Sequence, residues 1–198
     1  MELIIKPTAR ISKRDIYGFK ADDLLITFFQ TPIEADFSDE LSEEDESKPK
    51  KIGYIYAWRF DLDFSGRDLT YLADEINSDL CSCASFFFLE EGEESLSYNY
   101  LFYIEKVFIK PEYRGHGYAL QALAMFLQLF APGETVCCHP SHQEDLRDKY
   151  SGERGKLLMR KYWSKVGLNR YSEKHNILWA EEWDMPAWLM KQIFGIGE

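Results

Sequence analysis

The stretch YIEKVFIKPEYRGHGYA, residues 103–119, decides the fold of this chain. Its β-branched and aromatic residues predict a strand over residues 100–109, which Lys110-Pro111 ends because proline excludes the preceding residue from helical geometry. A turn with two glycines follows, and the apolar run of residues 117–130 then predicts a well-buried helix. The sequence therefore predicts a strand, a glycine-containing turn and a helix in direct succession.

The predicted turn has the features of an anion site. The first turn of a helix leaves backbone N–H groups without helical partners, and the macrodipole makes that end positive. Gly115 and Gly117 carry no side chain where a ligand approaches the backbone, and Arg114 adds a fixed positive charge. These residues predict a pyrophosphate site. The alternative is a plain turn in which the glycines serve geometry only. The sequence contains no P-loop, and its three-glycine dinucleotide pattern is incomplete.

The rest of the chain supplies further strands and helices. Strands are predicted at residues 3–5, 24–30, 52–60, 135–138 and 177–180, the second of them ended by Thr31-Pro32. Helices are predicted at residues 67–80, 155–166 and 186–194, the first from the spacing of Leu69, Leu72, Ile76 and Leu80. Residues 86–89 are left unassigned. No repeat is present, so we expect one α/β domain over residues 1–198 with a mixed sheet.

One segment differs from the rest in composition. Residues 34–47 are rich in Asp, Glu and Ser, and Lys48-Pro49-Lys50-Lys51 then reverses the charge. Such a composition has little to bury and predicts a solvated, mobile loop at about residues 34–51, between two strands. The alternative is a flap that captures a cation.

Composition excludes several classes of function. The chain has 198 residues, a net charge of −11 and 45% hydrophobic residues, which predicts a globular protein. The acidic charge predicts no nucleic-acid partner, since nucleic-acid backbones are also negative. No apolar run approaches the roughly 20 residues that span a bilayer, and residues 1–14 lack a signal-peptide core, so we expect no membrane partner and a cytoplasmic location. There the four cysteines are expected to be thiols.

Residues 104–119 resemble motif A of the GNAT superfamily of acyl-CoA N-acyltransferases. In that family a strand of the form L-E-x-L-x-V-x-P-x-Y-R-G precedes a [RQ]-x-x-G-x-[GA] turn. The matching positions are Arg114, Gly117 and Ala119 in the turn and Val107, Ile109, Pro111 and Tyr113 in the segment before it. The resemblance implies a GNAT-like α/β fold, with a mixed, mostly antiparallel central sheet flanked by helices. It also implies an acetyl-CoA-dependent N-acetyltransferase whose acceptor is a small-molecule or protein amine.

A second segment resembles a later helix of the same family. That helix typically ends Y-x-x-x-G-F, and residues 157–168 (LLMRKYWSKVGL) place Trp163 at the family's tyrosine, with Tyr162 beside it and Gly167-Leu168 at the end. The order of helices departs from the family, which has two helices between its first and second strands. Here that gap is short, and the predicted helix lies between the third and fourth strands. The acceptor therefore cannot be carried over from a relative.

The resemblance implies roles for named residues. The turn residues Arg114, Gly115, His116, Gly117, Tyr118 and Ala119 would hold the pyrophosphate of coenzyme A, and Val107, Phe108 and Ile109 would lie along its pantetheine arm. A bulge in this strand would leave an N–H group free to polarise the thioester. Glu105 is the expected general base, often acting through water, and Tyr162 the expected acid. The alternatives are a solvent-facing Glu105 paired with Lys106 and a structural Tyr162, with Trp163 packed in the core.

The sequence also bears on a metal site and on an alternative function. Cys137, Cys138 and His139, with Cys81 and Cys83, match no standard zinc spacing, and adjacent strand residues point to opposite faces, so no metal is expected. The alternative function is a catalytically silent GNAT-fold module that binds acyl-CoA or a protein. A homodimer is left open.

Overall fold

The computed structural model describes residues 2–6, 8–10, 26–36, 49–63, 66–90, 96, 99–141 and 152–195. The strands are β1 (Glu2–Ile5), β2 (Thr8–Arg10), β3 (Ile26–Asp36), β4 (Lys50–Asp61), β5 (Tyr100–Ile109), β6 (Thr135–Cys138), β7 (Arg170–Ser172) and β8 (Ile177–Ala180). The α-helices are α1 (Gly66–Asp74), α2 (Ser78–Leu89), α3 (Tyr118–Phe130), α5 (Gly152–Trp163) and α6 (Ala187–Phe194). Two 3-10 turns are η3 (Pro111–Tyr113) and η5 (Ser164–Val166).

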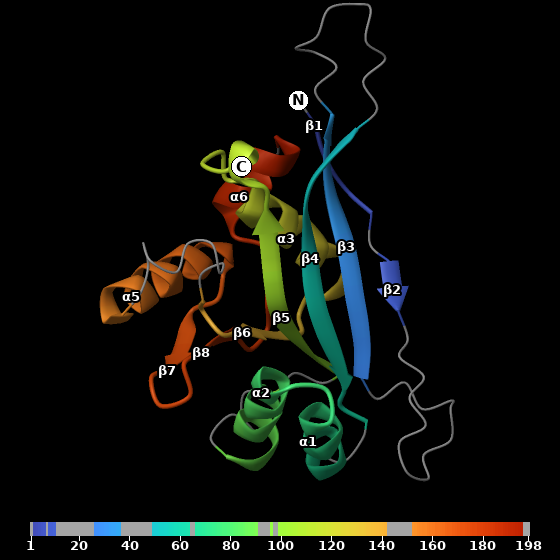
Figure 1. Cartoon of the computed structure of the whole chain (residues 1–198), viewed down its shortest axis with the longest axis vertical. Coiled ribbons are helices and arrows are strands. Elements are labelled where there is room, and N and C mark those ends of the chain that lie inside the picture. Colours follow the sequence, from blue (N-terminus) through green and yellow to red (C-terminus); the bar gives the residue numbers. More distant parts are fainter. Residues whose placement is uncertain are drawn as a thin grey trace, which may run out of the picture.

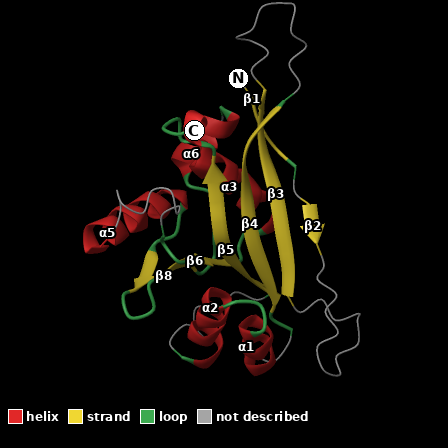
Figure 2. Cartoon of the chain, viewed as in Figure 1, coloured by secondary structure: helices red, strands yellow, loops and turns green. Residues whose placement is uncertain are grey.

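The described strands form one mixed sheet. Its order is β1-β3-β4-β5-β6-β8-β7. The short strand β2 also pairs with β3, on the same side of β3 as β1. The long strands β3, β4 and β5 are antiparallel and run side by side (Figure 2). β5 and β6 are parallel, and β6, β8 and β7 pair antiparallel. The predicted mixed, mostly antiparallel sheet flanked by helices is confirmed.

Helices cover both faces of the sheet. Successive side chains of the long strands point to opposite faces, so each face carries apolar side chains that a helix can cover. In β4, Ile55 and Ala57 pack into the core that includes Phe126 of α3, whereas Phe60 packs into a second core that includes Phe87 of α2. Figure 1 shows α1 and α2 together at one end of the sheet, with α3 behind the long strands. Among the described residues, no helix combines the length and apolar character that crossing a membrane requires.

The predicted end of the second strand at Thr31-Pro32 is wrong, because β3 continues to Asp36. Pro32 lies opposite the interruption between β1 and β2, where Lys6 donates its backbone N–H to the Pro32 carbonyl at 3.4 Å. Within a strand the N–H and C=O of one residue point to the same side. The proline nitrogen therefore faces this interruption, where no ladder hydrogen bond is required of it.

The predicted helix at residues 67–80 is two helices. α1 ends at Asp74, and α2 begins at Ser78 because the Asn77 side chain caps it, accepting the Leu80 N–H at 2.8 Å. The unassigned residues 86–89 form the last turn of α2. Leu69, Leu72 and Leu80 are buried together as their spacing predicted, but they come from both helices.

Both ends of the predicted acidic loop belong to strands. Glu34 lies opposite Lys51 and Ala35 opposite Lys50, which extends the β3–β4 ladder, and Glu34 and Lys51 are cross-strand partners of opposite charge. Lys6 adds an ion pair to Glu34 at 2.6 Å. Residues 37–48 lie outside the described residues, so the prediction of a mobile loop stays a prediction there. The short strands β2 and β7 were not predicted.

Candidate functional site

A pocket of about 540 Å³ opens beside the carboxyl half of β5. Its walls are β5, the turn after it, the start of α3, the end of β6 and the helix α5. The pocket is lined by most of the residues that the sequence predicted: Glu105, Val107, Ile109, Arg114, Gly115, Gly117, Tyr118, Ala119 and Tyr162. The tertiary structure therefore brings the motif residues and the α5 residue together around one cavity.

The pocket exists because β5 and β6 separate. Their parallel pairing ends at the pair Ile104 and Cys138, while β5 continues to Ile109 with β4 as its partner on the other side. In the described part of the chain, no strand pairs with β5 on the β6 side beyond Ile104. This open edge can receive the amides of an extended ligand as a further strand would.

The bulge that the resemblance implied is present in β5. Lys106 lies opposite Tyr56 and Ile104 lies opposite Ala57, so Glu105 is the extra residue of β5 and has no partner in β4. A bulge bends its strand and re-aims the side chains at that point. It stands at the position where β5 leaves β6, which places it at the inner end of the pocket.

The turn after β5 is shaped by two glycines in the left-handed region. Gly115 has φ +89° and Gly117, the N-cap of α3, has φ +80°. A Cβ on Gly115 would have no atom within 4 Å, and one on Gly117 would meet only Gln121 Nε2 at 3.6 Å. Packing does not demand glycine at either position, so the glycines supply the backbone conformation and also leave this pocket wall without side chains.

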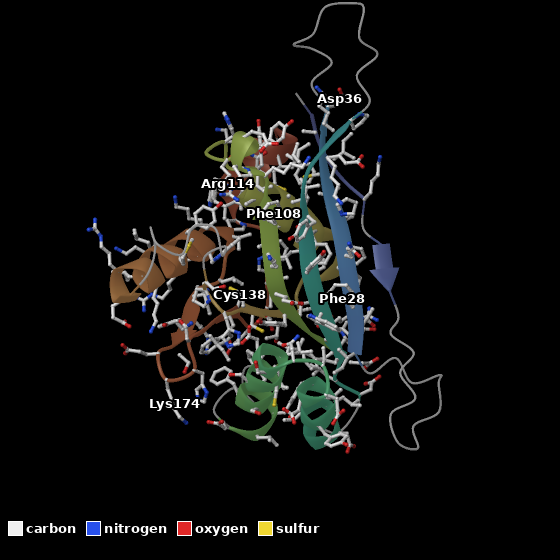
Figure 3. All side chains as sticks on the ribbon, viewed as in Figure 1. Phe28, Asp36, Phe108, Arg114, Cys138 and Lys174 are labelled. Atoms are coloured by element: carbon white, nitrogen blue, oxygen red, sulfur yellow. The ribbon has the colours of Figure 1, made fainter. Side chains whose placement is uncertain are left out.

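Arg114 is held across the turn. Its Nε–H donates to the Ile109 carbonyl at 2.8 Å, and its guanidinium carbon lies 5.7 Å from the centre of the Phe108 ring. The side chain lines the pocket, and Figure 3 labels it together with Phe108 and Cys138. The positive charge predicted beside the turn is therefore fixed at the pocket wall.

Glu105 is exposed and is oriented by a neighbouring strand. One of its carboxylate oxygens accepts the Trp58 Nε1–H at 2.5 Å. The predicted alternative pairing with Lys106 is not among the ion pairs of the described residues. Glu105 also lines the pocket, so its carboxylate is both positioned and accessible to water.

Tyr162 and Trp163 both line the pocket from the end of α5, with their ring centres 5.0 Å apart. Burial raises the pKa of Tyr162, so its phenol stays protonated at neutral pH. Its hydroxyl has no hydrogen-bond partner among the described residues. Trp163, predicted to pack in the core, packs against the α3 core and also contributes to the pocket.

Two predicted residues lie away from the pocket lining. The Phe108 ring stacks on Tyr54 with ring centres 5.1 Å apart, and the exposed His116 stacks on Tyr118 at 5.3 Å. The structure adds pocket residues to which the sequence analysis gave no role in the predicted site: Cys138, His139, Ser141, Met159 and Leu168. Cys138 ends β6, and His139 and Ser141 come just after it. The sequence analysis did not predict that β6 pairs in parallel with β5, and sites form at the carboxyl ends of parallel strands.

The four cysteines lie in the described part of the chain and none forms a disulfide. Cys83 and Cys137 are buried, with their sulfur atoms 3.2 Å apart. Among the described residues, no group of three or more His, Cys, Asp and Glu side chains is arranged to hold a metal ion.

Comparison with known proteins agrees with this geometry. The model of the acetyltransferase (GNAT) family matches residues 31–143, more than half of the chain, and includes β5, the glycine turn and α3. The chain belongs to the GNAT family. Membership supports acyl transfer as its general activity. Helical structure between β4 and β5, predicted from sequence as one helix and as a departure from the usual GNAT order, is present as the two helices α1 and α2.

A solved structure described as "The crystal structure of KacTA-DNA complex" is also similar to this GNAT chain. The sequences are 12% identical, the match covers 98% of this chain and 99% of the other, and the TM-score is 0.44. That structure includes DNA. It contradicts the prediction, made above from the net charge, that this chain has no nucleic-acid partner, and that prediction is withdrawn. At this level of likeness the match assigns no DNA-binding role to this chain. No curated protein matches the sequence.

Proposed function

We propose that this chain is an N-acetyltransferase that takes its acyl group from acetyl-CoA and transfers it to an amine by direct attack. The observation that carries the proposal is the single pocket that joins the glycine turn, the open edge of β5, and the side chains of Glu105 and Tyr162. These are the parts that anion binding, extended-ligand binding and proton handling require.

The residues fit coenzyme A at both ends of the pocket. The first turn of α3 and Arg114 would hold the pyrophosphate, because helix N–H groups and a fixed cation favour a dianion there. The open edge of β5 from Glu105 to Ile109 spans about 13 Å and would pair with the amides of the pantetheine arm. Acetyl-CoA supplies the activated acyl group when it is bound.

Glu105 is proposed as the general base. The acceptor amine must lose a proton as it attacks, and a water-accessible carboxylate at the inner end of the pocket can take that proton, directly or through water. The hydrogen bond from Trp58 fixes one carboxylate oxygen and so limits the orientations of the group.

Tyr162 is proposed to stabilise the leaving thiolate. Its protonated hydroxyl, without another partner among the described residues, can donate a hydrogen bond within the pocket. The ordinary pKa of a tyrosine is already above that of a thiol, and burial raises the pKa of Tyr162 further, so the phenol is a weaker acid than the leaving group. Donating a hydrogen bond is therefore its main contribution, and solvent completes the protonation of sulfur.

The test begins with the unmodified protein. Isothermal titration calorimetry measures CoA binding, and a thiol-release assay measures acetyl-CoA consumption with a panel of polyamines, amino acids, aminoglycosides and peptide amines. We expect CoA binding and turnover with at least one class of amine. CoA binding without turnover on any acceptor would favour a silent acyl-CoA-binding module, and absence of CoA binding would refute the proposal.

Two variants test the proton path. Glu105→Gln keeps the shape and removes the basic group, so kcat should fall by roughly 10²–10⁴-fold with CoA affinity nearly unchanged. The exposed Glu75, away from the pocket, provides the control Glu75→Gln. Tyr162→Phe should also slow turnover and spare binding. If Trp163→Phe is inactive while Tyr162→Phe is normal, the role belongs to the residue at position 163.

A further inference from the structure

His139 is a pocket residue to which the proposed function gives no role. It follows Cys138, the last residue of β6, and the pair Ile104 and Cys138 is the last that β5 and β6 share. The next residue on each strand lines the pocket, Glu105 on one side and His139 on the other. The imidazole therefore stands with the bulge at the point where the two strands separate.

The tautomer of His139 follows from its partner. The Tyr103 hydroxyl lies 3.0 Å from His139 Nδ1, and no other hydrogen bond of that hydroxyl occurs in the described part of the chain. Tyr103 is 2% exposed, and burial raises its pKa far above the ordinary range, so the phenol keeps its proton. A buried O–H without an acceptor costs about 1–3 kcal/mol. Tyr103 thus donates to Nδ1, and the hydrogen of the neutral imidazole sits on Nε2.

The imidazole is neutral at physiological pH. Burial lowers the pKa of His139, and the nearby His175 lowers it further, while Asp79 on α2 opposes both. His139 lines the pocket, and its Nε2 has no hydrogen-bond partner among the described residues. The structure therefore places one N–H donor, with a defined tautomer, on a side chain that lines the pocket.

We propose that His139 stabilises the oxyanion of acyl transfer, with Tyr103 as the positioning residue that sets its tautomer. This inference rests on the proposed function. As the acceptor nitrogen bonds to the acyl carbon, the carbonyl oxygen gains the π electron pair and accepts a hydrogen bond from Nε2–H. The pair returns when the C–S bond breaks and sulfur leaves as thiolate. His139 neither gains nor loses a proton.

Proton transfer from His139 is disfavoured by the same contacts. Loss of the Nε2 proton would leave an imidazolate, unless Tyr103 gave its own proton to Nδ1. That transfer would create a buried phenolate, which the raised pKa of Tyr103 opposes. A fixed donor that keeps its proton is the role left to this side chain, and one such donor is worth about 10²–10³-fold in kcat.

The first test needs no turnover. The chain has four histidines, so nitrogen-15 NMR of the free protein resolves a small set of imidazoles, and His139→Gln assigns the signal. We expect His139 in the Nε2–H form, and a mixture of tautomers in Tyr103→Phe. A predominant Nδ1–H form in the unmodified protein would overturn the inference.

The second test uses the active enzyme and the amine acceptor found in the panel. His139→Ala should lower kcat by about 10²–10³-fold while KM for acetyl-CoA stays within about threefold. His139→Gln keeps an N–H donor and should recover at least about tenfold over alanine. His175→Gln is the matched control, since His175 packs on Phe86 with ring centres 5.2 Å apart and lies outside the pocket lining.

The outcomes separate the two proposals. An unmodified protein that consumes no acetyl-CoA overturns the proposed function, and this inference with it. An active protein whose His139→Ala variant keeps full kcat overturns this inference alone. Thermal melting checks that each variant folds. If the alanine variant does not fold, the glutamine variant decides alone: a kcat within about tenfold of that of the unmodified protein supports the donor role, and a larger loss refutes it.

Discussion

Gly117 offers a test of the proposed coenzyme site because two effects of a methyl group can be separated there. The residue has φ +80°, and a Cβ would meet only the end of the Gln121 side chain at 3.6 Å. Left-handed geometry costs an L-residue about 1–2 kcal/mol. Since no packing clash adds to it, this strain should be the whole effect of Gly117→Ala on the free energy of unfolding.

Gly133 is a matched control for that strain. It has φ +73°, a Cβ there would have no atom within 4 Å, and it lies outside the pocket lining. Gly133→Ala should therefore destabilise the protein as Gly117→Ala does. For a chain of this size, each kcal/mol lowers the melting temperature by about 2–4 °C.

Only the variant at Gly117 should weaken coenzyme binding. A methyl group on the pocket wall keeps phosphate from the backbone N–H groups of the first turn, and hydrogen bonds to a charged group are worth about 1.5–3 kcal/mol. The Kd for CoA, measured by titration calorimetry, should rise by about 10- to 150-fold in Gly117→Ala. Gly117→Glu adds a negative charge and should abolish detectable binding with the fold intact. Equal CoA affinity in Gly117→Ala and Gly133→Ala would refute the assignment of this turn.

Three further predictions concern stability. Gly53→Ala would place a Cβ 2.1 Å from the Phe108 carbonyl oxygen, so the β4–β5 ladder must shift and urea denaturation should show a loss of about 3 kcal/mol, whereas an unchanged midpoint would contradict this. Gly167→Ala should lower the melting temperature more than Gly133→Ala, because a Cβ there also lies 3.2 Å from the Asp184 carbonyl at φ +100°. Burial lowers the pKa of His139, so below about pH 6.5 the unfolded chain binds a proton that the folded chain does not. Stability should fall from about pH 7 to pH 5, and His139→Gln should reduce this slope; identical slopes would show that this group does not contribute.

Elements set by neighbouring residues were predicted well. The strand, the glycine turn and the helix of residues 100–130 depend on proline, on glycine at positive φ and on apolar periodicity, and each acts over a few residues. The boundary at Asn77 is also set by neighbouring residues, because the Asn77 side chain caps α2. The sequence nevertheless predicted one helix there, because apolar residues continue at helical spacing across Asn77. The continuation of β3 through Pro32 was not local, because it depends on the gap between β1 and β2 on the neighbouring edge.

The sequence by itself determined the glycine turn of this GNAT chain, because residues 103–119 carry its strand, glycines and arginine in one contiguous run. Only the tertiary structure decided which residues face that turn across the pocket. The bulge at Glu105 is defined by the register with β4, and His139 reaches the same point because β6 pairs in parallel with β5. Tyr162 lies on α5, more than fifty positions after Glu105 along the chain. Strand register and helix placement depend on the packing of distant segments, and no local pattern in one sequence encodes them.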